Sequence, residues 1–351
     1  MPAGKKKVQS NSKLNIRSIV LLVIVVAILY FVLIFANKYY NPVRVPEETR
    51  IEFSIQSTQE VIERTQVSWT SAKSAKGIML LFHGCNHDAE DWFYLPEEKT
   101  FILNALEQNF HLIAISSAER IGPRCWNINF LHTDEDLKWH PDLSQVLKVT
   151  ELLIEREKWH NLPVVAVGAS SGGYFASMLP FYWNQQATNP IKAIISIIAP
   201  THPISISRIK SGSPFPAIGF IEMSKDMYTE ETIFNDAKLL HSQKIEHEIW
   251  KVAPVPLSLT FFYEKLNITL FQSAEMYNTL HKDKYLTSQD YLVADPRRSG
   301  WKASLTRQTN LKDLVETRYF EIEELMNVAW GSHEMTSAFC EDAIGWASLF
   351  I

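Results

Sequence analysis

The sequence predicts an α/β fold, in which helices cover both faces of a mainly parallel central sheet. Short apolar runs rich in β-branched residues recur along the chain, as in strands that are buried on both faces. Segments with helical periodicity separate these runs, and strands that alternate with helices form parallel sheets. The chain has 351 residues, 46% of them hydrophobic, which suits one large domain and one membrane segment. Its formal charge of −5 gives no electrostatic basis for binding nucleic acid.

The most informative apolar run is Val164–Val167, which leads into Gly168-Ala169-Ser170-Ser171-Gly172 and then into a segment that can be helical. G-x-S-x-G between a strand and a helix is the pattern of a nucleophile elbow, which lifts a serine above the sheet. Gly168 and Gly172 leave the space that the strained turn needs, and Ser170 would lie at a helix N-terminus, where N–H groups favour an oxyanion. The alternative is a glycine-rich turn with ordinary serines. Since further parts of the pattern follow in the right order, we expect an α/β-hydrolase fold.

The remaining elements are expected in chain order around this elbow. Arg50–Ser71 mixes apolar and polar residues and predicts an antiparallel pair of strands at the start of the domain. Pro96 opens a helix to about Gln108, because proline suits the first helical position and acidic residues follow it. The other expected elements are strands at Gly77–Phe82, His111–Ser116, Ile191–Ile198, Pro216–Ile221 and Ile245–Val252, and helices at Pro141–His160, Glu230–Gln243 and near Ser337–Leu349.

The oxyanion donors are expected on two loops. The first is the loop after the strand that runs into His83-Gly84-Cys85-Asn86, because in this fold that loop supplies one backbone N–H. Glycine there allows close approach of the backbone, and the donor is the N–H of Cys85 or of Asn86. The second donor is the N–H of Ser171, directly after the nucleophile. His83 is interpreted as a structural histidine that braces the loop and not as the base.

A serine nucleophile needs a base, and the base needs an acid that orients it. In this fold the chain order is serine, acid, histidine. Asp226 follows the strand that ends near Ile221, at the usual place of the acid; the alternatives are an ordinary loop or capping aspartate, with Glu222 as the substitute acid.

His333 follows all the predicted strands and precedes the last helix, so it is the expected base. His241, His247 and His281 also lie downstream, but in a helix, on an edge-like strand and in a charged stretch. His202 precedes Asp226 and would break the order.

The segment 255–325 separates the last predicted strand from His333 and is rich in aromatic residues. One hypothesis is a helical cap that shapes an apolar pocket for an acyl or leaving group. The equally weighted alternative is a helical subdomain whose aromatic residues form its own core.

The N-terminus contains a predicted membrane anchor. Ser18–Asn37 carries no charge and would span about 30 Å as a helix, which is the thickness of a bilayer core. Lysine and arginine are concentrated before it, so the positive-inside rule places residues 1–17 in the cytosol and the hydrolase domain in the lumen or outside the cell. A cleaved signal peptide would have a shorter apolar core and a small-residue cleavage site. Residues 38–60 are expected to form a stalk and residues 61–351 the domain.

The assembled motifs resemble a known family, the uncharacterised α/β-hydrolase-fold proteins of plants and related eukaryotes, which are often membrane-anchored. The resemblance covers about residue 78 to the C-terminus, and its elbow and His-Glu-Met-Thr blocks are the most specific parts. It implies the fold and the Ser170, Asp226 and His333 triad, and it implies no substrate. The matching residues are His83-Gly84-Cys85, Cys125-Trp126, Gly168 to Phe175, Lys225-Asp226, Pro256-Leu257, Phe261-Phe262, Arg298 to Trp301 and His333-Glu334-Met335-Thr336.

The three cysteines and one glycosylation sequon bear on the compartment. Cys85 and Cys125 both follow strands expected to be neighbours, so they form either a disulfide that braces the oxyanion loop or two buried free thiols. Asn267-Ile268-Thr269 is the one N-glycosylation sequon, and its use would require a lumenal domain. No residues have metal-ligand spacing except His83 and His87, which fall on a loop, and we expect no metal and no cofactor.

The sequence therefore predicts a membrane-anchored serine hydrolase of the carboxylic-ester type, acting on an ester, thioester or amide through an acyl-enzyme. Its expected partners are a small-molecule or lipid-like acyl substrate and the membrane. The alternatives are a non-catalytic binding protein with this fold and an acyltransferase that uses the same triad.

Overall fold

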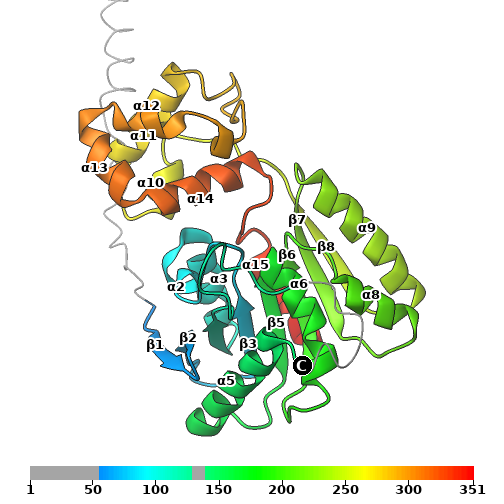
Figure 1. The fold of residues 1–351 in the computed structure, drawn as a ribbon. Coiled ribbons are helices and arrows are strands. Elements are labelled where there is room, and N and C mark those ends of the chain that lie inside the picture. The colour runs from blue at the N-terminus through cyan, green and yellow to red at the C-terminus, as the bar shows by residue number, and fades with distance from the viewer. Residues whose placement is uncertain (1–54, 129–138) are drawn as a thin grey trace, which may run out of the picture. The chain divides into compact units, whose positions relative to one another are not determined.

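The computed structural model describes residues 55–128 and 139–351, which belong to one compact unit that begins at Ile55 (Figure 1). The predicted anchor at residues 18–37 lies outside the described residues. Within the described ranges, no helix combines the length and the apolar composition needed to cross a bilayer.

The core of the unit is an eight-stranded sheet with the order β1-β2-β4-β3-β5-β6-β7-β8. The first two strands are joined as an antiparallel hairpin, and β2 is also antiparallel to β4, whereas the six strands from β4 to β8 are parallel. This order, with one elbow after β5, is the α/β-hydrolase fold. The strands are β1 Thr58–Ile62, β2 Thr65–Thr70, β3 Gly77–Phe82, β4 Phe110–Ile115, β5 Val164–Ala169, β6 Ile191–Ile197, β7 Ala217–Met223 and β8 His247–Val252.

Two hydrophobic layers cover the sheet, one on each face. Every residue of β3, β4, β5 and β7 is buried, and neighbouring residues alternate between the layers: Leu80 packs into one and Leu81 into the other. One layer is covered by α5 Pro141–Glu157, α6 Ser171–Met178, α7 Pro180–Trp183, α8 Pro203–Lys210 and α9 Met227–Ser242. The other is covered by α2 Asp91–Tyr94, α3 Pro96–Glu107 and α15 Cys340–Ala347, which leads into η2 Ser348–Phe350.

A helical cap lies between β8 and the loop that carries His333 (Figure 1). Its helices pack around a third hydrophobic cluster that contains no residue of the sheet, with Phe262 and Leu325 fully buried. The two ends of the cap meet, because the Val255 N–H donates to the Ala329 carbonyl and a Cβ on Gly331 would lie 3.1 Å from Pro254 N. The cap elements are α10 Phe261–Lys265, α11 Leu270–Lys282, η1 Pro296–Arg298, α12 Trp301–Thr306, α13 Thr309–Thr317 and α14 Tyr319–Trp330.

Most expected elements are present with boundaries shifted by a few residues, because the apolar runs are buried strands and the amphipathic segments cover them. β1 and β2 form the antiparallel pair expected within Arg50–Ser71, and β1 begins at Thr58, so this pair overlaps the end of the range expected for the stalk. The short helices α2, α7 and α8 were not expected, and α8 follows β6 with His202 as the cap of its first turn.

Candidate active site

Ser170 occupies the turn between β5 and α6, with φ 53° and ψ −116°. This backbone conformation is strained for a non-glycine residue, and such strain is a feature of nucleophile elbows. The motif glycines make the turn possible: a Cβ on Gly168 would lie 2.1 Å from the Gly172 carbonyl oxygen, and one on Gly172 would lie 2.2 Å from the Phe82 carbonyl oxygen. The elbow is therefore pressed against β3, and both positions exclude any side chain.

The side chains predicted as nucleophile, base and acid form a continuous hydrogen-bonded chain. Ser170 Oγ lies 3.0 Å from His333 Nε2, and His333 Nδ1 lies 2.5 Å from Asp226 Oδ2. Because an ionised carboxylate only accepts, Nδ1 carries the proton and Nε2 is left to accept from the Ser170 hydroxyl. The structure brings these residues together from the loops after β5, β7 and α14.

Asp226 is held as the anion. Its side chain is 13% exposed, and it also accepts the Thr229 N–H as the N-cap of α9. Burial raises the pKa of Asp226, but the hydrogen bonds from His333 and Thr229 outweigh it and keep the pKa below the ordinary value. Glu222, the substitute acid, is a buried residue inside β7 and makes no contact with His333 among the described residues.

The loop that carries His333 is fixed from two sides. Gly331 ends α14 in the left-handed conformation, and its carbonyl accepts the Lys225 N–H, which links this loop to the Asp226 loop. From the cap, Arg297 donates to the carbonyls of Ser332 (3.0 Å) and His333 (2.7 Å). Arg297 is not among the residues predicted from the sequence, and no local motif marks it, because its partners lie 35 and 36 residues away.

The other candidate histidines lie elsewhere. His241 is in α9, His281 is in α11, and His247 on β8 contacts the Ile245 carbonyl through Nδ1. His202 caps α8. Of these residues and His333, only His333 contacts Ser170.

The geometry selects between the two proposed donors on the oxyanion loop. The Asn86 N–H donates to the Pro123 carbonyl, so it is occupied. Within the described part of the chain, no backbone acceptor is paired with the N–H of Cys85 or of Ser171. Gly84 lies beside the nucleophile, since a Cβ on it would be 3.7 Å from Ser170 Cβ. Of the predicted donors, Cys85 and Ser171 therefore keep an N–H without a backbone acceptor among the described residues, whereas Asn86 does not.

His83 orients the peptide that carries the first of these donors. Its Nε2 accepts the Ser117 N–H at 3.1 Å, so the ring proton is on Nδ1, which donates to the Gly84 carbonyl at 2.7 Å. The C=O and N–H of a trans peptide point in opposite directions, so holding the Gly84 carbonyl sets the direction of the Cys85 N–H. Burial lowers the pKa of His83 to about 3, which keeps the ring neutral.

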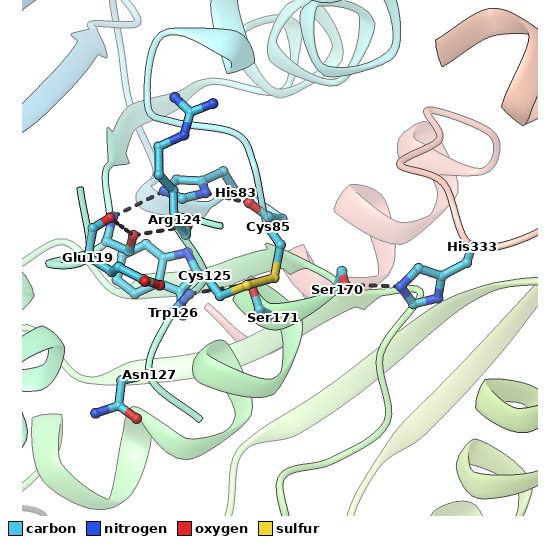
Figure 2. The surroundings of a disulfide bond; sticks show 12 residues. His83, Cys85, Glu119, Arg124, Cys125, Trp126, Asn127, Ser170, Ser171 and His333 are labelled. Atoms are coloured by element: carbon cyan, nitrogen blue, oxygen red, sulfur yellow. Dashed lines mark hydrogen bonds between the residues drawn. A yellow bond between two sulfur atoms is a disulfide. The ribbon is translucent and has the colours of Figure 1, made fainter. Parts of the chain in front are cut away.

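A disulfide joins Cys85 to Cys125, with a Cα–Cα distance of 4.2 Å (Figure 2). The next residue, Trp126, donates its N–H to Ser171 Oγ at 3.4 Å, and the Arg124 guanidinium donates to the Asn86 carbonyl. The segment around Cys125 therefore connects the oxyanion loop to the first turn of α6. Of the two alternatives for these cysteines, the structure contains the disulfide, while Cys340 is a buried free thiol.

A cavity of about 600 Å³ opens at Ser170 and His333. Apart from Phe320, the aromatic residues of the segment 255–325 do not line this cavity, which favours the alternative of a helical subdomain with its own core. Most of those residues are used by the cap's own core, because five short helices must bury their apolar faces against one another. The cap contributes mainly polar side chains to the cavity: Glu323, Glu324 and Asn327 of α14, and Arg297, beside one exposed Phe320.

Two other predicted features have a position in the structure. Asn267 is exposed at the start of α11, and Thr269 of its sequon caps that helix. Among the described residues, no group of three or more histidine, cysteine or acidic side chains is arranged to hold a metal ion.

Comparison with known proteins gives structural similarity alone. No family model and no curated protein matches the chain. It is similar to a dienelactone hydrolase from Anabaena variabilis, with 14% identity, 57% of this chain and 88% of that chain covered, and a TM-score of 0.39. It is also similar to esterase PE8, with 14% identity, 60% of this chain and 100% of that chain covered, and a TM-score of 0.38. An esterase/lipase from an uncultured bacterium has 11% identity, 64% of this chain and 83% of that chain covered, and a TM-score of 0.40. At these scores, the fold is identified from the chain's own strand order and elbow.

Proposed function

We propose that the protein is a serine hydrolase that cleaves a carboxylic ester, thioester or amide through an acyl-enzyme. The observation that carries this proposal is the chain of hydrogen bonds from Ser170 through His333 to Asp226, on a strained elbow that faces a cavity. A binding role alone places no demand on this alignment, whereas catalysis requires it.

In the proposed mechanism, Ser170 Oγ attacks the substrate carbonyl while His333 Nε2 takes its proton. Asp226 stabilises the imidazolium that forms, and the N–H groups of Cys85 and Ser171 receive the negative charge that develops on the carbonyl oxygen. His333 then protonates the leaving group. Water, deprotonated by the same imidazole, releases the acid from Ser170.

The test is covalent labelling with a fluorophosphonate probe, applied to the full-length chain in detergent. We expect the wild type to be labelled, Ser170→Ala to be unlabelled, and Ser242→Ala, a change at an exposed serine on α9, to be labelled like the wild type. A folded wild type that resists the probe would contradict the proposal and favour a binding protein with this fold.

We also propose that residues 18–37 anchor the chain with the hydrolase domain in the lumen or outside the cell. The charge distribution around residues 18–37, the Cys85–Cys125 disulfide and the exposed Asn267 sequon support this orientation, since disulfides and N-glycans belong to oxidising compartments. The test is expression of the full chain in cells: a glycosidase-sensitive mass that is lost in Asn267→Gln supports the orientation. Digestion of the domain by protease added to the cytosolic side of sealed membranes would refute it.

A further inference from the structure

Packing does not hold His333, the base of the proposed triad, in place. Its side chain is 50% exposed, and among the described residues the ring hydrogen-bonds only to Ser170 and Asp226. The backbone φ of His333 is 41°, in the left-handed region, which is strained for a residue other than glycine. The conformation that brings Nε2 to Ser170 therefore needs support from the backbone of its loop.

Arg297 supplies this support from the cap. Its Nη1 donates to the Ser332 carbonyl and its Nη2 to the His333 carbonyl, so the two arms of one guanidinium hold the two peptides that flank His333. In extended backbone, successive carbonyls point in opposite directions, and Arg297 reaches both here because His333 is not extended. Within the described ranges, no other group donates to either carbonyl.

Two carboxylates fix the guanidinium of Arg297 in turn. Asp295, the N-cap of η1, accepts the Arg297 N–H at 3.0 Å, and its carboxylate lies 3.7 Å from Nη1. Nη2 also donates to Glu334 Oε2 at 3.0 Å, and Asn327 Nδ2 donates to the same oxygen at 2.8 Å. Glu334 directly follows the base, and its Oε1 accepts the Met335 N–H at 3.1 Å. Residues of η1, of α14 and of the His333 loop thus form one connected network.

A strained backbone persists only where the surrounding contacts enforce it. We propose that Arg297 is a positioning residue of the hydrolase, which holds the two peptides beside His333 so that Nε2 of the ring stays within reach of Ser170. Without Arg297, the loop relaxes and the imidazole moves away from the nucleophile, whereas the oxyanion donors on the other loops keep their positions. The cap is then part of the catalytic machinery as well as a wall of the cavity. The inference rests on the proposed hydrolase function.

The first experiment measures how fast the fluorophosphonate probe labels full-length variants at increasing probe concentration. Arg297→Ala should lower the maximal labelling rate about 10- to 100-fold, since a displacement of about 1 Å costs that much, and should leave the half-saturating probe concentration within about threefold. The matched control is Arg298→Ala at the next position of η1. Arg298 is exposed and its side chain makes no hydrogen bond or ion pair with a described residue, so its removal should change both values by less than about twofold. An unchanged maximal rate in Arg297→Ala would overturn the proposal, and so would a change confined to the half-saturating concentration.

Two further measurements separate positioning from a general loss of folding. Guanidinium chloride at millimolar concentration, far below what unfolds a protein, should restore part of the labelling rate of Arg297→Ala, whereas sodium chloride at the same concentration should not. Arg297→Lys keeps the charge but replaces the planar fork by a single point donor, so its labelling rate should recover only in part. A wild-type rate in Arg297→Lys would contradict the bridging of the two peptides.

A spectroscopic measurement separates this inference from the proposed function. His333 Nδ1 lies 2.5 Å from Asp226, and a proton in so short a hydrogen bond to a carboxylate gives a far-downfield proton NMR signal. The signal, assigned by its loss in Asp226→Asn, should disappear in full-length Arg297→Ala and remain in Arg298→Ala. If the probe labels Ser170 but neither the labelling rate nor the signal changes in Arg297→Ala, the positioning role is wrong and the hydrolase stands. If the probe fails on the wild type and the signal is lost with Arg297, the hydrolase is wrong and the support of His333 by Arg297 stands.

Discussion

The buried imidazole of His83 predicts a specific loss of stability in acid. His83 is 3% exposed, and its Nε2 accepts the Ser117 N–H, so protonation would place a second N–H against that donor. Burial lowers the pKa of His83 to about 3, compared with an ordinary value of 6.5. The unfolded chain therefore takes up a proton at this residue near pH 6.5, whereas the folded chain does so only near pH 3. Stability is lost as the pH falls through this window.

The magnitude follows from the width of the window. Each pKa unit corresponds to about 1.36 kcal/mol. At about pH 4.5, two pH units below the ordinary pKa, the neutral state of His83 should therefore lower the free energy of unfolding by about 2.7 kcal/mol relative to neutral pH. The perturbation that isolates this contribution is His83→Asn, whose amide can still donate to the Gly84 carbonyl but does not titrate. Its loss of the acceptor for Ser117 lowers stability equally at both pH values.

The assay is urea unfolding of the full-length wild type and His83→Asn at about pH 7.5 and about pH 4.5. We expect the wild type to lose about 2.7 kcal/mol more than the variant between the two conditions, because all other groups titrate in both proteins. An equal loss in the two proteins would refute the neutral, buried state of His83 and with it the tautomer that orients the Cys85 N–H.

Three further changes test the elbow, the disulfide and the acid. In urea melts, Gly172→Ala should lower the free energy of unfolding by at least about 3 kcal/mol, because the new Cβ would lie 2.2 Å from a strand carbonyl. The control is Gly345→Ala, whose Cβ would have its nearest neighbouring atom 3.9 Å away, and it should change the free energy of unfolding by less than about 1 kcal/mol. Replacing Cys85 and Cys125 by serine opens a covalent loop with a sequence separation of 40, so the free energy of unfolding in urea melts should fall by about 4 kcal/mol. The same change should lower kcat at least tenfold, since loss of one oxyanion donor lowers kcat by about 10² to 10³. Asp226→Asn should lower kcat for an ester about 10⁴-fold with little change in KM, and a drop below tenfold would argue against its assigned role.

The elements of the sheet could be predicted because burial on both faces leaves an unambiguous pattern. β3, β4 and β5 are continuous apolar runs, and the elbow glycines mark where β5 turns into α6. The positions of Ser170, Asp226 and His333 followed from chain order in this fold, and the structure places the three side chains in contact. Their catalytic role remains a prediction that the labelling experiment tests.

The chemistry of the cavity could not be predicted, because it depends on contacts between distant segments. Glu98 follows Pro96 at the start of α3, which is the pattern of an exposed acidic first turn, yet the cap buries it against Glu324. In the same way, the phenylalanines and tyrosines of the cap suggested a pocket, although helices that form their own core use such residues internally. Sequence periodicity shows which face of a helix is apolar, but not which neighbouring segment that face meets.

The meeting of the two ends of the cap at Pro254 and Gly331 has a consequence for how this protein could diversify. An insertion whose ends adjoin can be exchanged or enlarged without disturbing the strands that flank it. Here, however, the exit from the insertion runs directly into His333, and Arg297 within it holds the carbonyl of that residue. The same segment therefore contributes side chains to the cavity and also supports the loop of His333, the proposed base. A change in this segment is therefore expected to alter substrate range and turnover together. A chimera with a foreign insertion must also contain a residue that holds the His333 loop as Arg297 does.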